Sequence, residues 1–148
     1  PIKFENYIWS KAFSLTILAL PICFGIVFSA HGFSFNYFAF ISAVLFSSLL
    51  FALLGFIGVA RVQTFNQYII IIPLFFAPAI IPLLDLFDLW FHPLLYLIPT
   101  QASLLLFRAS FEPISFFEWT YAISYLTIWL AAARYFAVKA YKKHLLIN

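Results

Sequence analysis

Long apolar runs, separated by short polar stretches, dominate the pattern of this sequence. From residue 12 to residue 60 there is no Asp, Glu, Lys or Arg, whereas about 20 helical residues suffice to cross the hydrocarbon core of a bilayer. A polar, glycine-containing turn at 30–36 divides this interval. The pattern therefore predicts two membrane-spanning helices, over about 12–30 and 36–59.

Two further spans are predicted in the second half of the chain. Residues 62–84 are uncharged but contain Pro73, Pro78 and Pro82. Because proline removes a backbone donor, we expect this span to be kinked or to end early. The last span is predicted at about 118–138, where aromatic residues stand at both ends, as is typical of membrane interfaces.

The segment 86–111 is apolar but interrupted. His92-Pro93 and Pro99 break it into halves that are each too short to cross a bilayer. Two half-helices that meet at a polar, proline-marked bend predict a re-entrant hairpin, which is allowed at membrane depth only where protein or water covers the backbone. A fifth full span is the alternative.

The composition indicates an integral membrane protein. Hydrophobic residues make up 66% of the 148 positions and charged residues only 9%, with a mean hydropathy of +1.05, whereas soluble domains have about 25% charged residues. A single cysteine, Cys23, excludes an internal disulfide. Soluble enzymes, disordered tails and disulfide-stabilised secreted domains are therefore excluded as classes.

The distribution of charge predicts the orientation. With four spans and the N-terminus inside, Arg108 is the only Lys or Arg on the outer side. The inner side then holds seven basic residues: Lys3, Lys11, Arg61, Arg134, Lys139, Lys142 and Lys143. Four of the five acidic residues fall outside: Asp85, Asp88, Glu112 and Glu118. A fifth span would export the basic C-terminus, so the positive-inside rule favours four spans with both termini cytoplasmic.

The N-terminal segment 1–11 is predicted to be a helix that lies along the inner interface. Coiled as a helix, it places Phe4, Ile8 and Trp9 on one side and Lys3 and Asn6 on another. Two interpretations remain open: an anchor that orients the first span, or a docking helix for a soluble partner.

Small residues recur every fourth position in the second span, at Ala39, Ala43 and Ser47, with Gly55 and Gly58 further along. Small side chains let helices approach closely in lipid, so this stripe predicts a helix-packing seam. A subunit interface or a substrate path is the alternative.

Three potential metal ligands, Asp85, Asp88 and His92, are spaced to share one face of a continuous helix. Three ligands on one helix rarely complete a metal site, and Pro93 follows directly. We therefore expect these three residues to be solvated at the membrane boundary and to bind no metal. The chain contains no phosphate-binding glycine loop, zinc-protease motif or nucleophile elbow. We therefore predict no catalytic residues and no nucleic-acid partner.

Four segments together resemble a known family: PIKFENYIWSK at 1–11, the stretch 55–68 that ends in TFNQY, the proline-broken stretch 73–85, and HPLLYLIPTQ at 92–101. The chain resembles the membrane subunits of type-2 ABC exporters, and in particular the fluoroquinolone-export permease group. The resemblance covers essentially the whole chain.

The resemblance implies a specific organisation. Such permeases have six spans, a cytoplasmic coupling helix between the second and third, and an outer re-entrant hairpin before the sixth. Residues 2–11 then correspond to the coupling helix, and 86–111 to the hairpin. The chain would be a C-terminal fragment that lacks the first two spans. The expected fold is an all-α integral membrane domain over 1–148, with four transmembrane helices, an interfacial helix and the hairpin.

The resemblance also implies a function and its residues. The expected function is that of a permease subunit in the plasma (inner) membrane, which works with a second permease copy to export hydrophobic or amphiphilic drug-like compounds. No cofactor is expected in this chain, and ATP and Mg would bind to a separate ATP-binding subunit. We expect that subunit to dock on Lys3, Phe4, Glu5, Asn6 and Tyr7. The outer hairpin or gate would use Asp85, Asp88, His92 and Gln101, and helix packing Ala43, Ser47, Gly55 and Gly58.

A different class of function remains as the alternative hypothesis. The chain could be a non-transporting membrane scaffold, or an intramembrane enzyme that uses Asp85, Asp88 and His92. An enzymatic function would require these three side chains to lie close together, whereas a transport function would not.

Overall fold

Helices make up nearly all of the structure, a computed structural model that describes residues 4–60, 62 and 64–145, with only the backbone described at residues 4 and 143–145. The elements in chain order are α1 (Phe4–His31), α2 (Tyr37–Val59), α3 (Phe65–Ile80), α4 (Leu83–Leu86), the 3-10 helix η1 (Pro93–Leu97), α5 (Pro99–Arg108) and α6 (Phe116–Leu145).

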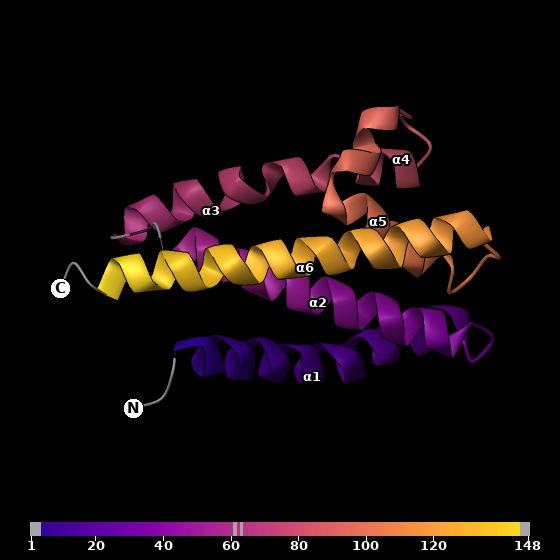
Figure 1. Ribbon diagram of the computed structural model, residues 1–148. Helices are drawn as coiled ribbons and strands as arrows, with labels where there is room; N and C mark the ends of the chain where they lie inside the picture. Colours follow the sequence, from indigo (N-terminus) through magenta and orange to yellow (C-terminus); the bar gives the residue numbers. More distant parts are fainter. Residues whose placement is uncertain (1–3, 61, 63, 146–148) are drawn as a thin grey trace.

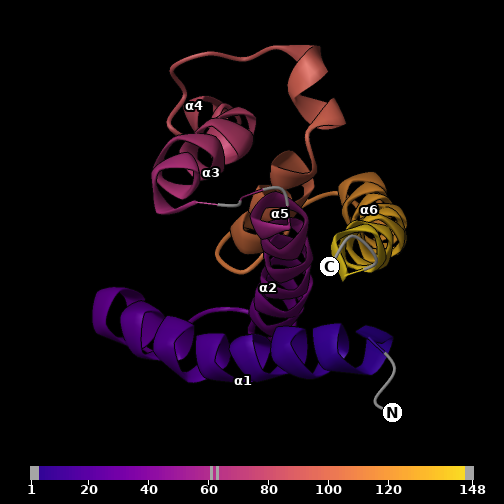
Figure 2. The same cartoon turned by 90° about the vertical axis from the view of Figure 1, so that its left-hand side faces the viewer.

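Helix α2 lies at the centre of a bundle, with α1, α3, α5 and α6 around it (Figure 2). The start of α1 and the end of α6 lie together at one end, which we call the termini end (Figure 1). The turn 32–36 and the segment 81–115 lie at the opposite end, which we call the hairpin end. The two ends therefore place different parts of the sequence, with different charges, on opposite sides of the bundle.

Three of the described helices are long and apolar enough to cross a membrane: α1 over 5–31, α2 over 37–59 and α6 over 116–142. Helix α3 is apolar but has only 16 residues. Its length of about 24 Å falls short of a hydrocarbon core of about 30 Å. The structure thus confirms the all-helical fold of the described residues and gives three candidate spans, whereas a fourth complete span stays a prediction.

Local sequence signals set the helix boundaries. Gly32 ends α1 with a left-handed φ of 68°, which glycine adopts without steric cost. Asn36 caps α2 by accepting a hydrogen bond from the backbone N–H of Ala39 at 3.2 Å. Ser115 and Glu118 form a reciprocal capping box, with Ser115 N–H donating to Glu118 Oε2 at 2.7 Å and Glu118 N–H to Ser115 Oγ at 3.2 Å. Helix α6 therefore begins at Phe116, two residues before the predicted 118.

A cluster of phenylalanine rings fills the space between α1, α2 and the hairpin end. Phe24 meets Phe40 edge to face at 5.0 Å between ring centroids, and Phe35 meets Phe40 in the same way at 5.3 Å. Edge-to-face pairs are the favoured geometry for aromatic rings. The backbone N–H of Asn36 also donates to the carbonyl of Ser110 at 2.8 Å, which ties the turn to the end of the hairpin segment.

The predicted boundary near residue 11 is absent, because residues 4–31 form the single helix α1. No glycine or proline lies between Phe4 and Pro21, so nothing in this stretch interrupts the backbone hydrogen bonds at the point where composition changes from amphipathic to apolar. The N-terminal segment is thus continuous with the first span.

The predicted span 62–84 is shorter in the structure. Helix α3 ends at Ile80, where the N–H of Ile81 bonds instead to the carbonyl of Pro78 at 3.4 Å. Pro82 then opens the short helix α4. The prolines remove backbone donors and so shorten the helix, one of the two outcomes expected from them.

The segment 86–111 contains two short helices and no full span. The 3-10 helix η1 and the ten-residue α5 meet at Ile98, whose extended backbone makes the bend before Pro99. Proline disfavours helical geometry in the residue that precedes it, which explains the bend. The alternative of a fifth span is therefore wrong, and the two-armed arrangement agrees with the predicted hairpin.

Candidate functional site

Asp85 and Gln101 meet at the hairpin end, although 16 positions separate them in sequence. Gln101 Nε2 donates to Asp85 Oδ2 at 2.5 Å. Asp85 lies on α4 and Gln101 in the first turns of α5, where only 3% of its surface is exposed. The other amide atom, Gln101 Oε1, is buried and has no hydrogen-bond partner. The two predicted gate residues thus form a contact between the arms of the hairpin segment.

A cavity of about 440 Å³ adjoins this contact. Its polar lining consists of His31, Asp85, Asp88, Gln101, Arg108 and Glu112, and its apolar lining includes Leu105, Phe107 and Phe111. Asp88 has a left-handed φ of 54°, a conformation that Asp adopts more readily than most residues. The structure therefore brings three of the four predicted gate residues to one cavity.

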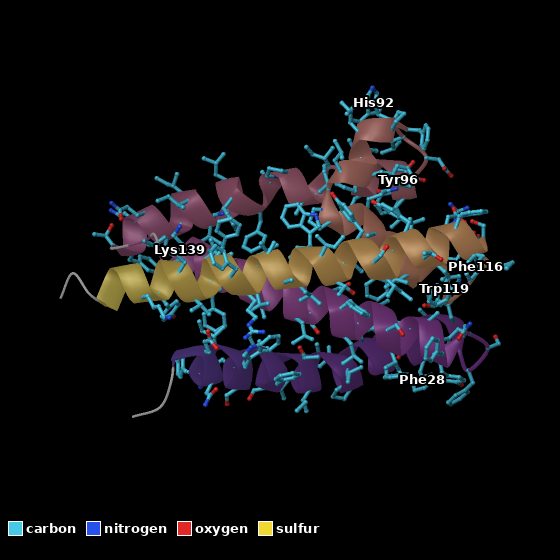
Figure 3. The ribbon with its side chains drawn as sticks, in the orientation of Figure 1. Phe28, His92, Tyr96, Phe116, Trp119 and Lys139 are labelled. Atoms are coloured by element: carbon cyan, nitrogen blue, oxygen red, sulfur yellow. The ribbon has the colours of Figure 1, made fainter. Side chains whose placement is uncertain are left out.

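His92 is the exception among the predicted gate residues. It caps η1, where its Nδ1 accepts a hydrogen bond from the N–H of Leu94 at 3.2 Å, and it does not line the cavity. Figure 3 shows it at the outer edge of the hairpin end. Helix α4 ends at Leu86, so Asp85, Asp88 and His92 do not share a helical face. The geometry therefore gives no support to an enzyme built on these three residues.

Arg108 and Glu112 form an exposed ion pair at the rim, with Arg108 Nε 3.0 Å from Glu112 Oε2. The hydrogen bond to this carboxylate, reinforced by its charge, raises the pKa of Arg108, which therefore remains a cation throughout the physiological range. The single guanidinium of the cavity is thus already engaged with one of its three carboxylates.

Two tyrosines of α6 hold η1 in place. The Tyr121 hydroxyl donates to the backbone carbonyl of Tyr96, and the Tyr125 hydroxyl donates to that of Leu97 at 2.6 Å. Burial raises the pKa of Tyr96, and the nearby charge of Asp85 adds to the effect, so this phenol stays neutral. Tyr121 and Tyr125 were predicted only as part of an interfacial aromatic group, and the sequence gives no signal for their partners.

At the termini end, α1 and α6 are joined by one ion pair. Arg134 Nη2 lies 3.6 Å from Glu5 Oε2, and the guanidinium also stands over the ring of Trp9 at 5.8 Å. Lys139 and Lys142 line the same hollow of about 610 Å³, and Lys139 is labelled at this end of the bundle in Figure 3. Sequence reasoning missed Arg134 as the partner of Glu5, because 129 positions separate them.

The predicted docking residues fall on the first turns of α1. Asn6 and Tyr7 are exposed, and Glu5 is half-exposed, whereas Ile8 is 1% exposed and belongs to the core shared with α2, α5 and α6. Lys3 and the side chain of Phe4 lie outside the described residues. The segment thus has one face packed on the bundle and one polar face that is open to a partner.

Comparison with known proteins supplies what geometry alone does not. A family model described as the fluoroquinolones export permease protein family matches residues 1–148. The chain belongs to this family. Its three apolar helices of spanning length agree with membership of a membrane-protein family.

Two curated relatives from Mycobacterium tuberculosis, of the strains CDC 1551 / Oshkosh and ATCC 25618 / H37Rv, are each named fluoroquinolones export permease protein. Each is 31% identical to this chain over 131 residues, which cover 84% of this chain and 54% of the relative. The chain spans about half the length of these relatives. No solved structure matches it.

The predicted packing seam of this family member lies where α2 meets its neighbours. Ala43 is fully buried and Ser47 is 9% exposed. A methyl group added at Gly58 would come within 3.1 Å of Ile72 on α3, whereas one added at Gly55 would meet nothing within 4 Å. Gly58 is therefore the residue of the seam that permits close approach of α3, and Gly55 faces open space.

A polar contact that the sequence did not reveal joins α1 to α2 beside this seam. Ser48 Oγ donates to Thr16 Oγ1 at 3.0 Å, and Thr16 in turn donates to the carbonyl of Ala12 at 2.9 Å. Thr16 is only 2% exposed. Hydroxyl bonds of this kind join helices inside membranes, and a Thr in an apolar helix is the one sequence signal that could have indicated it.

Proposed function

We propose that the chain is the membrane-spanning part of a permease subunit of an ATP-driven, type-2 ABC exporter. Its substrates would be hydrophobic or amphiphilic drug-like compounds, such as fluoroquinolones, which leave the cell. The observation behind this proposal is the match of residues 1–148 to the fluoroquinolones export permease protein family. Three apolar helices of spanning length support it.

The proposal includes partners and an orientation. A separate subunit binds ATP and Mg and docks on the first turns of α1, and a second permease copy completes the transport path in the plasma (inner) membrane. The termini end lies in the cytosol. The supporting observation is charge: Arg134, Lys139 and Lys142 lie together at this end, whereas the carboxylates of the cavity lie at the other.

The contacts of α1 suggest how motion at the docking face would reach the hairpin end. Ile8 and the Glu5–Arg134 pair join the first turns of α1 to α6. Helix α6 runs the length of the bundle, and at its other end Tyr121 and Tyr125 hold η1. A displacement of the first turns of α1 would therefore shift α6 and the hairpin segment with it.

An accumulation assay tests the transport proposal. The full-length permease and its ATP-binding partner are expressed in a bacterial host that lacks its own drug pumps, and uptake of a fluorescent fluoroquinolone is measured. We expect lower steady-state accumulation than with a partner whose P-loop lysine is replaced. Equal accumulation with both partners would refute export of this substrate class.

The coupling proposal has its own variant. Replacement of Glu5 by Gln removes the charge that attracts Arg134, and we expect efflux to fall relative to ATP hydrolysis in the full-length complex. The matched control is Ser14→Ala, an exposed substitution about 14 Å further along the same helix. Efflux per ATP hydrolysed should change only in the first variant, and an unchanged ratio would count against docking at this segment.

A further inference from the structure

We propose that the cavity at the hairpin end is a binding site for aromatic organic cations, with the ligand's ammonium or iminium charge beside Asp85 and Asp88 and its flat ring against Phe107 and Phe111. This site is separate from the docking face of α1 and from the contacts of α6. Its role in export rests on the proposed function, whereas binding itself does not.

The charges that line the cavity select the sign of the ligand. Three carboxylates face one guanidinium, and that guanidinium is bound to Glu112. Within the described part of the chain, neither Asp85 nor Asp88 forms an ion pair. A carboxylate next to apolar side chains and without a cationic partner gains from a cationic ligand, because the lower local dielectric strengthens the attraction.

Gln101 provides a second, independent observation that points to a ligand. Its Nε2 donates to Oδ2 of Asp85, which fixes the direction of the carboxylate and leaves Oδ1 without a hydrogen bond from the residues that the structure describes. Its Oε1 is buried without any partner, in a side chain that is 97% withdrawn from solvent and lines the cavity. Buried acceptors in native proteins almost always have a donor, so Oε1 is an acceptor beside this wall of the cavity whose bonding a ligand donor would complete.

The remaining lining explains why the ligand is aromatic. Phe107 and Phe111 line the cavity together with the ring of His31, which lies 4.7 Å from that of Phe111. Leucine side chains, among them Leu105, complete the apolar part. Ring faces attract flat π-systems and cations alike, and a volume of about 440 Å³ lies within the range of sites for drug-sized ligands.

Equilibrium binding of ethidium, a flat and permanently charged aromatic cation, tests the proposal on the purified full-length protein in detergent. Ethidium fluorescence should rise on binding. The double variant Asp85→Asn, Asp88→Asn should weaken its affinity about tenfold or more, since charge-assisted contacts are lost. The matched control is Glu118→Gln, which lies at the same end, does not line the cavity and can still cap α6. The affinity of this control variant for ethidium should stay within a factor of about two of the wild-type affinity.

A variant with the opposite expected effect guards against misfolding. Arg108→Gln removes the permanent cation that lines the cavity, so ethidium should bind about threefold more tightly, an increase that a damaged protein cannot mimic. An uncharged aromatic probe, N-phenyl-1-naphthylamine, should bind the wild type and all variants alike. The proposal would be overturned if ethidium did not bind, or if its affinity were unchanged both by the double variant Asp85→Asn, Asp88→Asn and by Arg108→Gln.

The binding assay separates this proposal from the proposed function. Charge-dependent ethidium binding without any ATP-dependent change in drug accumulation would support the site and refute export. Fluoroquinolone export by a protein that binds ethidium with the same affinity in the wild type and the double variant would refute the site and support export.

Discussion

The two ends of the bundle differ in how many of their polar groups are buried. Each end has an exposed ion pair: Arg108–Glu112 at the hairpin end and Glu5–Arg134 at the termini end. The hairpin end in addition withdraws polar groups from solvent: Gln101 is 3% and Ser110 is 2% exposed, and the Tyr121 hydroxyl donates to a backbone carbonyl. The two ends therefore differ in the polar groups buried beside their ion pairs, and not in the exposure of the ion pairs.

The difference indicates what each end can do. A buried hydrogen bond is strong, and the loss of one partner leaves the other unsatisfied, so the hairpin end is expected to be rigid. An exposed ion pair contributes little and exchanges readily with water. The termini end can therefore rearrange against a soluble partner, while the hairpin end keeps the shape of its cavity.

The largest effect is expected from the core beneath the hairpin. Leu106 of α5 is fully buried, and Leu106→Ala should lower the free energy of unfolding by about 2–5 kcal/mol, because the surrounding helices cannot close the cavity completely. Thermal unfolding of the full-length protein in detergent measures this. Leu94→Ala, at a side chain 61% exposed, is the control and should cost far less. Equal losses would mean that α5 is not packed as described.

An intermediate effect is expected from the tyrosine that holds η1. Tyr121→Phe removes the hydroxyl that serves the Tyr96 carbonyl and should cost about 1–2 kcal/mol, most of it from the acceptor left unpaired. The same unfolding measurement applies. Tyr135→Phe on the same helix, at a side chain 63% exposed near the termini end, is the control. A similar cost at both positions would remove the distinction between the two ends.

The smallest effect is expected from the exposed ion pairs. Glu5→Gln at the termini end and Glu112→Gln at the hairpin end should each lower the free energy of unfolding by about 0–1 kcal/mol, and less in high salt. Salt-dependent unfolding curves measure both. Because the two pairs are similarly exposed, similar values would show that burial, and not charge, distinguishes the ends. A large and salt-insensitive loss for Glu5→Gln alone would contradict this.

Sequence pattern predicted the apolar elements well where one local signal was strong. The span predicted at 36–59 is the helix Tyr37–Val59, because an asparagine cap precedes it and no proline interrupts it. It was less accurate where two signals compete. The amphipathic start of α1 suggested a separate helix, but the backbone continues regardless of which side chains it bears.

The candidate site was only partly accessible from sequence. Asp85, Asp88 and Gln101 were identified as polar residues of the hairpin segment, and they do line one cavity. His92, which was grouped with them, lies apart, because α4 ends at Leu86 and the chain turns before it. Arg108 and the ring of His31 were not recognised as parts of this site, since helix ends far apart in sequence bring them there.

Composition and hydrophobic period are enough to establish that this protein is helical and apolar, with basic residues near both ends of the chain and acidic residues between its last spans. Which polar groups meet depends instead on how the helices pack. The Glu5–Arg134 pair, the Thr16–Ser48 bond and the Asp85–Gln101 contact each join different helices. Their geometry depends on how the helices pack around α2, and a one-dimensional pattern contains no distances between helices.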